Sequence, residues 1–128
     1  MEVMAGLTQE ELDFKEQPRK WVCSENLAKH IGNAVTILCK VMERVDENKI
    51  IVSDMVGQIT CTCNNEELFL FAEKDDYVQL EGWALSETEI QCCSLEELKD
   101  EATNDETVLL RTKAALMMDQ YSAVVYAQ

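Results

Sequence analysis

The residues best suited to chemistry in this chain are six cysteines and a single histidine. The cysteines are Cys23, Cys39, Cys61, Cys63, Cys92 and Cys93. Cys61 and Cys63 are separated by one residue in a predicted strand, and this spacing places both side chains on one face of the strand. Zinc-binding pairs instead leave two to four residues between the cysteines and lie on turns. We therefore expect free thiols that pack as small apolar side chains. We also expect His30 to lie at the surface or at a helix end.

Signatures of enzyme chemistry are absent from the sequence. The chain contains no P-loop, no dinucleotide-binding glycine motif, no HExxH zinc motif and no GxSxG nucleophile elbow. Its carboxylates occur in runs on predicted loops and polar faces, which is typical of solvated surface. We therefore expect no catalytic residues, no metal and no cofactor, and a protein that is not an enzyme.

The charge of the chain argues against direct binding of nucleic acid. The net charge is −14, of which residues 1–63 carry −3 (10 acids, 7 bases) and residues 64–128 carry −11 (15 acids, 4 bases). Nucleic-acid-binding proteins draw much of their affinity from cationic contacts to phosphate. The chain is therefore expected to bind DNA poorly by itself, with Lys49 and Trp83 as candidate minor contacts. An independent nucleic-acid-binding module remains the alternative.

The sequence lacks the patterns of a membrane span and of a secretory signal. It contains no apolar run long enough to span a membrane. It begins without the basic start and apolar core of a secretory signal. We therefore expect no membrane partner and an intracellular, reducing compartment.

Five predicted strands organise the middle of the chain. They are Val35–Val45, Lys49–Ser53, Gln58–Cys63, Tyr77–Leu85 and Glu89–Ser94. This number and order, with a helical segment at each end, favours a mostly β fold: a five-stranded oligonucleotide/oligosaccharide-binding (OB) barrel with a short N-terminal helix and a C-terminal helix. In many such barrels the second and third strands carry aromatic residues on which bases stack. Neither of those strands has an aromatic residue here.

Local signals mark the ends and bends of these elements. Ser24 is expected to cap a short helix, Glu25–Ile31. Gly57 is expected to supply a positive φ at the turn between the second and third strands. Gly82, in the middle of the fourth strand, predicts a bend or bulge.

The segment Asn64–Lys74 connects the third and fourth strands. Asn64 or Asn65 can cap a short helix there. The segment carries an apolar cluster, Leu68, Phe69, Leu70 and Phe71. We expect this cluster to close one end of the barrel, and a partner-binding patch is the alternative.

The predicted organisation has three parts. Residues 1–20 form an N-terminal extension with a short helix, Gln9–Glu16, residues 21–98 form the barrel, and residues 99–128 form an acidic linker and a C-terminal oligomerisation helix. The strongly acidic stretch Leu95–Glu106 is expected to be a solvated linker. The last helix is predicted to run from Asn104 to about Val125. Either Asn104 or Asp105 can act as its cap.

The predicted last helix has more apolar surface than one contact would bury. One stripe holds Leu110, Ala114, Met117, Met118, Tyr121, Val124 and Val125. Leu109 and Leu116 lie on one flank of this stripe, and Val108 and Ala115 lie on the opposite flank. Monomeric proteins seldom expose so large an apolar patch. The helix is therefore expected to pack against a helix of another chain, and the alternative is a helix wrapped entirely onto its own barrel.

The segments LAKHIGNAVTILCKV, IIVSD and YVQLEGWAL, followed by a final helix, resemble the small subunit of replication protein A. That protein is the eukaryotic single-stranded-DNA-binding heterotrimer, and related small subunits occur in telomere and telomerase-associated complexes. The resemblance covers about residues 25–121 and depends on hydrophobic patterns with Gly32, Asp54 and Gly82. The acidic stretch before the helix, the N-terminal extension and the first strand without glycine depart from the family pattern.

The resemblance implies a non-catalytic structural subunit in the nucleus. It would act in DNA replication and repair or in telomere maintenance, including as a telomerase accessory. Its last helix would join helices of the middle and large OB-fold subunits in a bundle, and those partners would hold the single-stranded DNA. The implied bundle residues are Leu109, Leu110, Ala114, Leu116, Met117 and Tyr121.

Overall fold

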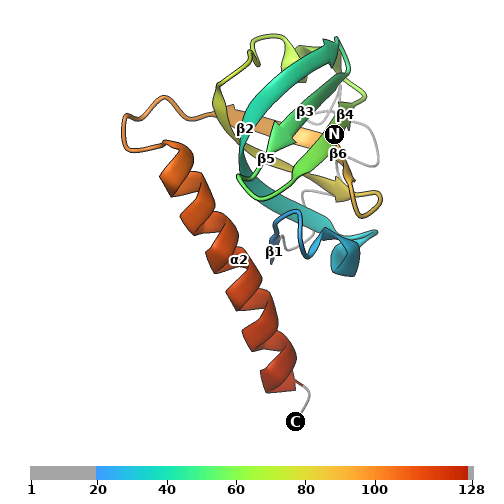
Figure 1. The fold of residues 1–128 in the computed structure, drawn as a ribbon. Helices are drawn as coiled ribbons and strands as arrows, with labels where there is room; N and C mark the ends of the chain where they lie inside the picture. The colour runs from blue at the N-terminus through green and yellow to red at the C-terminus, as the bar shows by residue number, and fades with distance from the viewer. Residues whose placement is uncertain (1–19, 127–128) are drawn as a thin grey trace, which may run out of the picture.

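A computed structural model of the chain shows a β-barrel with one long helix beside it (Figure 1). It describes residues 20–126, with side chains through Asp119, so the predicted helix Gln9–Glu16 lies outside the described residues. The strands are β1 (Lys20–Trp21), β2 (Ala34–Asp46), β3 (Lys49–Ser53), β4 (Gln58–Cys63), β5 (Tyr77–Ala84) and β6 (Glu89–Glu97). The helices are the 3-10 turns η2 (Leu27–His30) and η3 (Glu66–Phe69) and the α-helix α2 (Asp105–Tyr126).

The barrel closes because β2 is long enough to pair with two neighbours. Its first half, from Ala34 to Lys40, pairs antiparallel with β5, and its second half, from Lys40 to Asp46, pairs antiparallel with β3. The remaining ladder runs from β3 through β4 and β6 back to β5, with β4 and β6 parallel. The predicted five-stranded OB-like barrel, mostly β with a C-terminal helix, is therefore confirmed.

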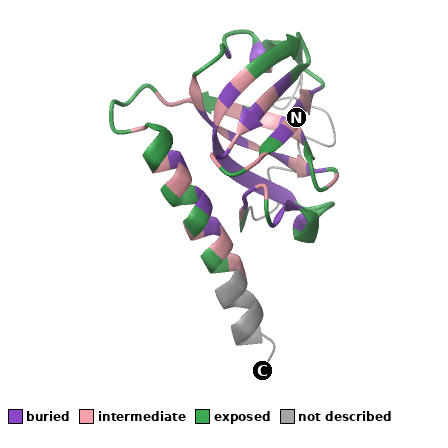
Figure 2. Cartoon of the chain, in the orientation of Figure 1, coloured by how far each residue is buried: buried purple, intermediate pink, exposed green. Residues whose placement is uncertain are grey.

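The core of the barrel is lined by one face of every long strand. Buried positions alternate with half-buried or exposed ones along β3, β4 and β5, as expected for strands with one face toward the core (Figure 2). The buried positions include Ile37, Cys39, Val41, Ile50, Val52, Ile59, Cys61, Val78, Leu80, Ile90 and Cys92. Phe69 of η3 is completely buried and closes one end of the barrel, as predicted, whereas Leu70 and Phe71 point outward with 52% and 74% of their surface exposed.

Two glycines have different roles from each other. At Gly82 the pairing of β5 with β6 shifts, and a Cβ there would lie 2.1 Å from the carbonyl oxygen of Gln91, so the predicted bulge is confirmed. The prediction for Gly57 is wrong, because Met55 takes the positive φ (76°) of the β3–β4 turn. Gly57 is instead needed for space, since its Cβ would approach the Ser24 hydroxyl to 2.6 Å.

The short helices were predicted with mixed success. Asn65 caps η3, accepting a hydrogen bond from the Glu67 amide as expected. The helix predicted over Glu25–Ile31 is only a 3-10 turn, and Ser24 does not cap it. Ser24 donates through its amide and its hydroxyl to the carboxyl oxygens of Asp54, at 2.6 and 3.1 Å.

Two stretches of β structure were not predicted. β1 pairs parallel with β2 at Val35 and Thr36. β6 continues to Glu97, since Leu95 pairs with Leu80 and Glu97 pairs with Val78. The beginning of the stretch expected to be a solvated linker is therefore part of the barrel.

α2 begins where the sequence indicates. Asn104 caps it by accepting a hydrogen bond from the Thr107 amide at 3.0 Å, and Asp105 and Glu106 occupy the first turn, as the helix dipole favours. The helix runs beside β2 and extends past the end of the barrel (Figure 1). Within residues 20–126, no helix has the length and apolar character required to span a membrane.

Candidate assembly interface

α2 contacts its own barrel along a narrow line of small side chains. Val108, Thr112 and Ala115 are buried, with 0%, 4% and 1% of their surfaces exposed, and they are spaced by four and then three residues (Figure 2). That spacing places them on one face of the helix. Side chains of this size allow the helix to approach the barrel closely while burying little apolar area.

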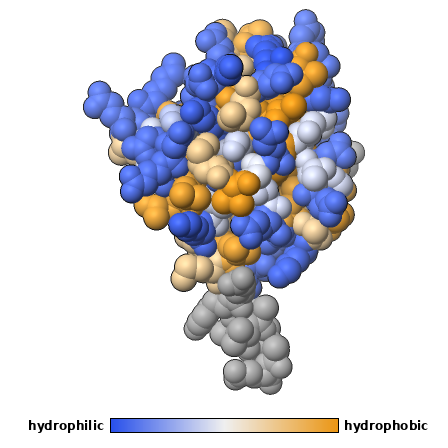
Figure 3. All heavy atoms as spheres, in the orientation of Figure 1, coloured by the Kyte–Doolittle hydropathy of each residue, from blue (hydrophilic) through white to orange (hydrophobic). Residues whose placement is uncertain are grey.

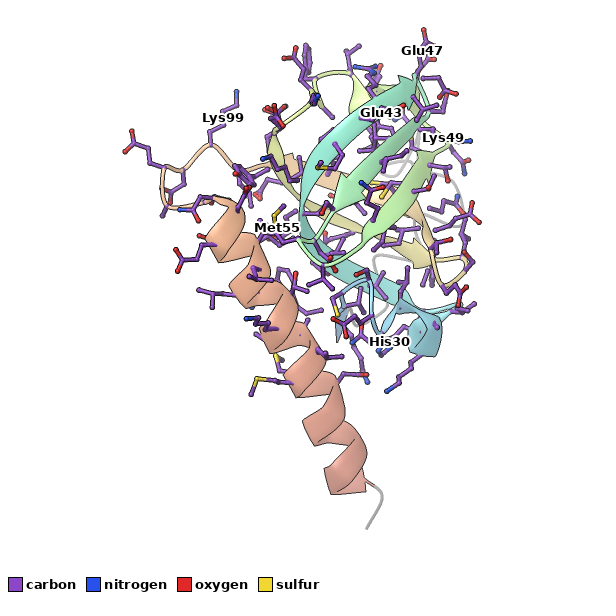
Figure 4. The ribbon with its side chains drawn as sticks, in the orientation of Figure 1. His30, Glu43, Glu47, Lys49, Met55 and Lys99 are labelled. Atoms are coloured by element: carbon purple, nitrogen blue, oxygen red, sulfur yellow. The ribbon has the colours of Figure 1, made fainter. Side chains whose placement is uncertain are left out.

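A buried polar contact fixes the middle of α2 on the β3–β4 turn. The Thr112 hydroxyl contacts the Asp54 carbonyl oxygen at 2.8 Å and the Val108 carbonyl oxygen at 2.9 Å. The side chain of Asp54 is itself buried and accepts hydrogen bonds from the amides of Ser24, Val56 and Gly57. Figure 4 shows Met55 at this turn, on the side of the barrel where α2 runs. One turn residue therefore joins the N-terminal segment, the barrel and the helix.

The first turn of α2 is held by an exposed polar cluster. Asp105 accepts a hydrogen bond from the Tyr77 hydroxyl at 2.6 Å and pairs with Lys40 at 3.2 Å. These two contacts, the tyrosine hydrogen bond first, hold the pKa of the Asp105 carboxyl below its usual range. The same contacts raise the pKa of Tyr77 and of Lys40. The start of the helix is therefore held by these exposed polar contacts in addition to the buried side chain of Val108.

Further along, α2 contacts the segment before β2. The Arg111 guanidinium stacks over the Trp21 ring, 4.5 Å from its centre. His30, at the end of η2, lies 2.9 Å from the Asp119 carboxyl through its Nε2 atom. The expectation of a helix-end histidine is correct, but a surface position is wrong, since only 6% of His30 is exposed.

The most exposed apolar side chains of α2 point away from the barrel. Leu110, Met117 and Met118 have 60%, 66% and 56% of their surfaces exposed, while Leu109, Ala114 and Leu116 are half-buried. Figure 3 shows apolar side chains among polar ones on the exposed side of the helix. The predicted interface residue Tyr121, with Val124 and Val125, lies beyond the described side chains.

Leu110, Ala114 and Met117 repeat the spacing of the barrel-facing line on another face. They follow one another by four and then three residues, as Val108, Thr112 and Ala115 do, but begin two residues later. Two residues correspond to about 200° around an α-helix. We call the three residues Leu110, Ala114 and Met117 the outer seam. It lies opposite the barrel and has the spacing of helices that pack side by side.

The two candidate nucleic-acid contacts lie far apart. Lys49 pairs with Asp46 at the end of β2, whereas Trp83 pairs with Ala34 at its start. Twelve residues of strand separate these positions, roughly 40 Å of chain at about 3.3 Å per residue. Lys49 is exposed on β3 (Figure 4) and Trp83 is half-buried on β5. They would therefore act as separate contacts and not as one site.

The cysteines are packed in the barrel. Five of the six are buried and Cys93 is half-buried, and all of them are free thiols. Burial raises the pKa of the Cys39, Cys61 and Cys92 thiols, which keeps them protonated and unreactive. Among residues 20–126, no cluster of His, Cys, Asp or Glu side chains is arranged to hold a metal ion.

Sequence reasoning identified the outer seam but missed the contacts that orient it. Thr112 and the Arg111–Trp21 stack were not singled out, and Asp54 was named only as part of the family pattern, without its contact to α2. The tetrapeptide from Asp54 to Gly57 has the composition of a turn in which an aspartate side chain accepts local amides. That signal predicts the turn, but it does not predict that the turn contacts α2.

Several solved structures share this fold. A chain of U. maydis replication protein A bound to single-stranded DNA has a TM-score of 0.62 and 16% identity, over 83% of this chain and 96% of that chain. The telomere capping protein Ten1 from Saccharomyces pombe has a TM-score of 0.60 and 12% identity, over 75% and 99%. A chain in the structure of yeast Stn1 and Ten1 has a TM-score of 0.61 and 13% identity, over 92% and 82%. Both the first and the second neighbour are matched over nearly their whole length.

Sequence comparison does not add a family to this structural likeness. No protein-family profile matches the chain, and no curated protein sequence matches it. The resemblance to replication protein A and to related telomeric proteins is confirmed at the level of the fold.

Proposed function

We propose that this chain is a non-catalytic OB-fold subunit of a complex that binds single-stranded DNA. Its role is to hold partner subunits through α2, while the partners make most of the contacts to the DNA. The complex acts in the nucleus, in replication and repair or in telomere maintenance, and contains larger OB-fold subunits. A heterotrimer assembled through a bundle of three helices is the arrangement that the family resemblance implies.

The outer seam carries this proposal. The helix is already attached to its barrel through its opposite face, so intramolecular packing does not account for the exposed Leu110 and Met117. Partner helices that packed on the outer seam would remove this apolar surface from water, which is the main driving force of association. The neighbours support the proposal, because one is a replication protein A chain and another comes from a structure that contains yeast Stn1 and Ten1 together.

The proposal is tested by placing charges on the outer seam. The double variant Leu110→Asp, Met117→Asp is co-expressed with the larger OB-fold subunits of replication-protein-A-like complexes from the same organism. We expect affinity for at least one of them to fall by about 100-fold or more, because two unpaired carboxylates would be buried. The free energy of unfolding of the isolated chain should change by less than about 0.5 kcal/mol, since both positions are exposed.

Lys74→Asp is the matched control. It changes the net charge by −2, as the double variant does, but it lies on the exposed loop before β5, away from α2. It should leave binding of the partner unchanged. Full retention of the partner by the double variant would contradict the proposal.

The isolated chain should bind single-stranded DNA weakly or not at all. Its net charge of −14 repels phosphate, and β3 and β4 offer no aromatic side chain for stacking. Fluorescence anisotropy with a labelled oligothymidine at low salt measures this directly. Micromolar or tighter binding that Lys49→Ala or Trp83→Ala weakens would favour the alternative, an independent nucleic-acid-binding module.

A further inference from the structure

A second surface feature lies at the other end of the barrel from η2, where the connection between β4 and β5 meets the end of β6. It is an open hollow of about 580 Å³. Its lining residues are Glu67, Leu68, Phe71, Ala72, Glu73, Asp76, Leu95, Glu97 and Lys99. Figure 4 places Lys99 on the loop that leads from β6 to α2. The volume falls within the range of about 300–1,000 Å³ that is typical of ligand sites in proteins.

The floor of the hollow is apolar and anchored to the core. Leu68 and Leu95 are half-buried and pack against the core cluster, and Ala72 is almost completely buried. Phe71 stands beside this floor with 74% of its surface exposed. An apolar side chain of a partner could insert between the exposed phenylalanine ring and the apolar floor.

The walls of the hollow are built of ordered backbone. The Glu73 amide donates to the Asp76 carboxyl at 3.0 Å, and the Ala72 amide donates to the Phe69 carbonyl oxygen at 3.1 Å. The Arg44 guanidinium donates to the Leu70 carbonyl oxygen at 3.0 Å, which ties the connection to the end of β2. The shape of the hollow is therefore set by the fold before any partner binds.

The rim is strongly acidic. Glu67, Glu73, Asp76 and Glu97 contribute four carboxylates, and Lys99 contributes one cation, which gives a net charge of −3. Lys99 already pairs with Glu97 at 3.4 Å. The Glu67 and Glu73 carboxylates are exposed, and neither forms an ion pair with another side chain among residues 20–119.

We propose that this hollow binds a short basic segment of a partner protein, in which one large apolar side chain is flanked by lysines or arginines. The apolar side chain packs on Leu68, Ala72 and Leu95 beside Phe71. The flanking cations pair with Glu67 and Glu73. The surface is separate from the outer seam, so the chain can hold an assembly partner and a basic segment at once.

Charge distinguishes this occupant from the two that the chain itself offers. Residues 1–19 contain five acids (Glu2, Glu10, Glu11, Asp13, Glu16) and two bases (Lys15, Arg19), so their net charge of −3 is repelled by the rim. A second copy of the chain carries −14 and is repelled more strongly. The negative potential of the rim, which repels residues 1–19 and a second copy of the chain, attracts a cationic segment.

The test uses the full chain and a defined probe. The probe is a fluorescein-labelled eight-residue peptide with a central leucine–tryptophan pair and three basic residues on each side. A second peptide replaces the central pair with two serines. We expect the first peptide to bind at least about tenfold more tightly than the second, and its amide shift changes in NMR spectra to concentrate in residues 66–76 and 95–99.

Substitutions at exposed positions locate the binding without threatening the fold. Phe71→Ser should weaken the first peptide by about tenfold, and Glu67→Gln with Glu73→Gln by about fivefold. The control Glu87→Gln with Glu101→Gln removes the same charge from exposed positions outside the hollow and should have no effect.

Three results would overturn the proposal. Equal binding of the two peptides, or shift changes spread over the acidic surface, would show attraction by net charge alone. Sedimentation could show that the free chain is a dimer and that Phe71→Ser makes it monomeric. That result would show that a second copy occupies the hollow. The outer-seam variant tests the assembly function separately, because it leaves the hollow intact.

Discussion

The two faces of α2 differ in a way that reverses the usual pattern of a surface helix. The face against the barrel carries Val108, Thr112 and Ala115 and is fixed by polar contacts at Asp105 and Asp119, whereas the face away from it carries Leu110 and Met117. A helix stabilised only within its own domain normally buries its largest apolar residues. The inner face therefore orients the helix, and the outer face provides the apolar area for binding. The predictions that follow disturb the two faces in turn.

Overpacking the inner face should have the largest effect. Ala115→Leu places three extra carbons between α2 and the barrel, where there is no free surface, and should weaken attachment of the helix by about 1–3 kcal/mol. Ala114→Leu adds the same atoms one residue earlier, within the outer seam, and should be nearly neutral. Hydrogen exchange of the α2 amides measures both variants. Equal protection in the two would show that the faces do not differ in packing.

Removing the buried hydroxyl should have an intermediate effect. Thr112→Val keeps the shape of the side chain but loses its contacts with the carbonyl oxygens of Asp54 and Val108, at a cost of about 1 kcal/mol. Thr112→Ser retains the hydroxyl and should recover most of that loss. Urea unfolding of the three proteins measures the difference. A valine variant as stable as the wild type would mean that the polar contact does not hold the helix.

The exposed polar cluster at Asp105 should give the smallest effect and one that depends on pH. Because the pKa of Asp105 is lowered in the folded chain, its contribution to stability is complete above the unfolded value near 3.9 and is lost as the pH falls through the lower folded value. Asp105→Asn should remove this component, so wild type and variant should converge in stability once the pH falls below the lowered pKa of Asp105. Unfolding measured from pH 2 to pH 6 tests this. Parallel curves over that range would rule the cluster out.

The strands could be predicted closely because their signal is local. Lys49–Ser53 and Gln58–Cys63 have the predicted bounds, since alternation and turn residues specify a half-buried strand within a few residues. The caps at Asn65 and Asn104 were also predicted, because each depends on a side chain close to the amide that it accepts. The apolar stripe of α2 was visible for the same reason.

The features that were missed depend on distant partners. β1 has only two residues and forms because these residues pair with the edge of β2. The end of β6 reads as an acidic linker, but pairing with β5 overrides its composition. His30 is buried because Asp119, 89 residues later, reaches it. Ser24 has the composition of a helix cap, yet it hydrogen-bonds to Asp54, 30 residues later in the chain.

Asp54 gives the turn between β3 and β4 an architectural consequence. Its side chain holds the Ser24 segment and its own turn, and its carbonyl oxygen receives the Thr112 hydroxyl. The direction in which α2 leaves the barrel is thus determined in part by a four-residue loop. A related chain that lengthened this loop would keep its barrel and its helix but aim its neighbours along a different axis.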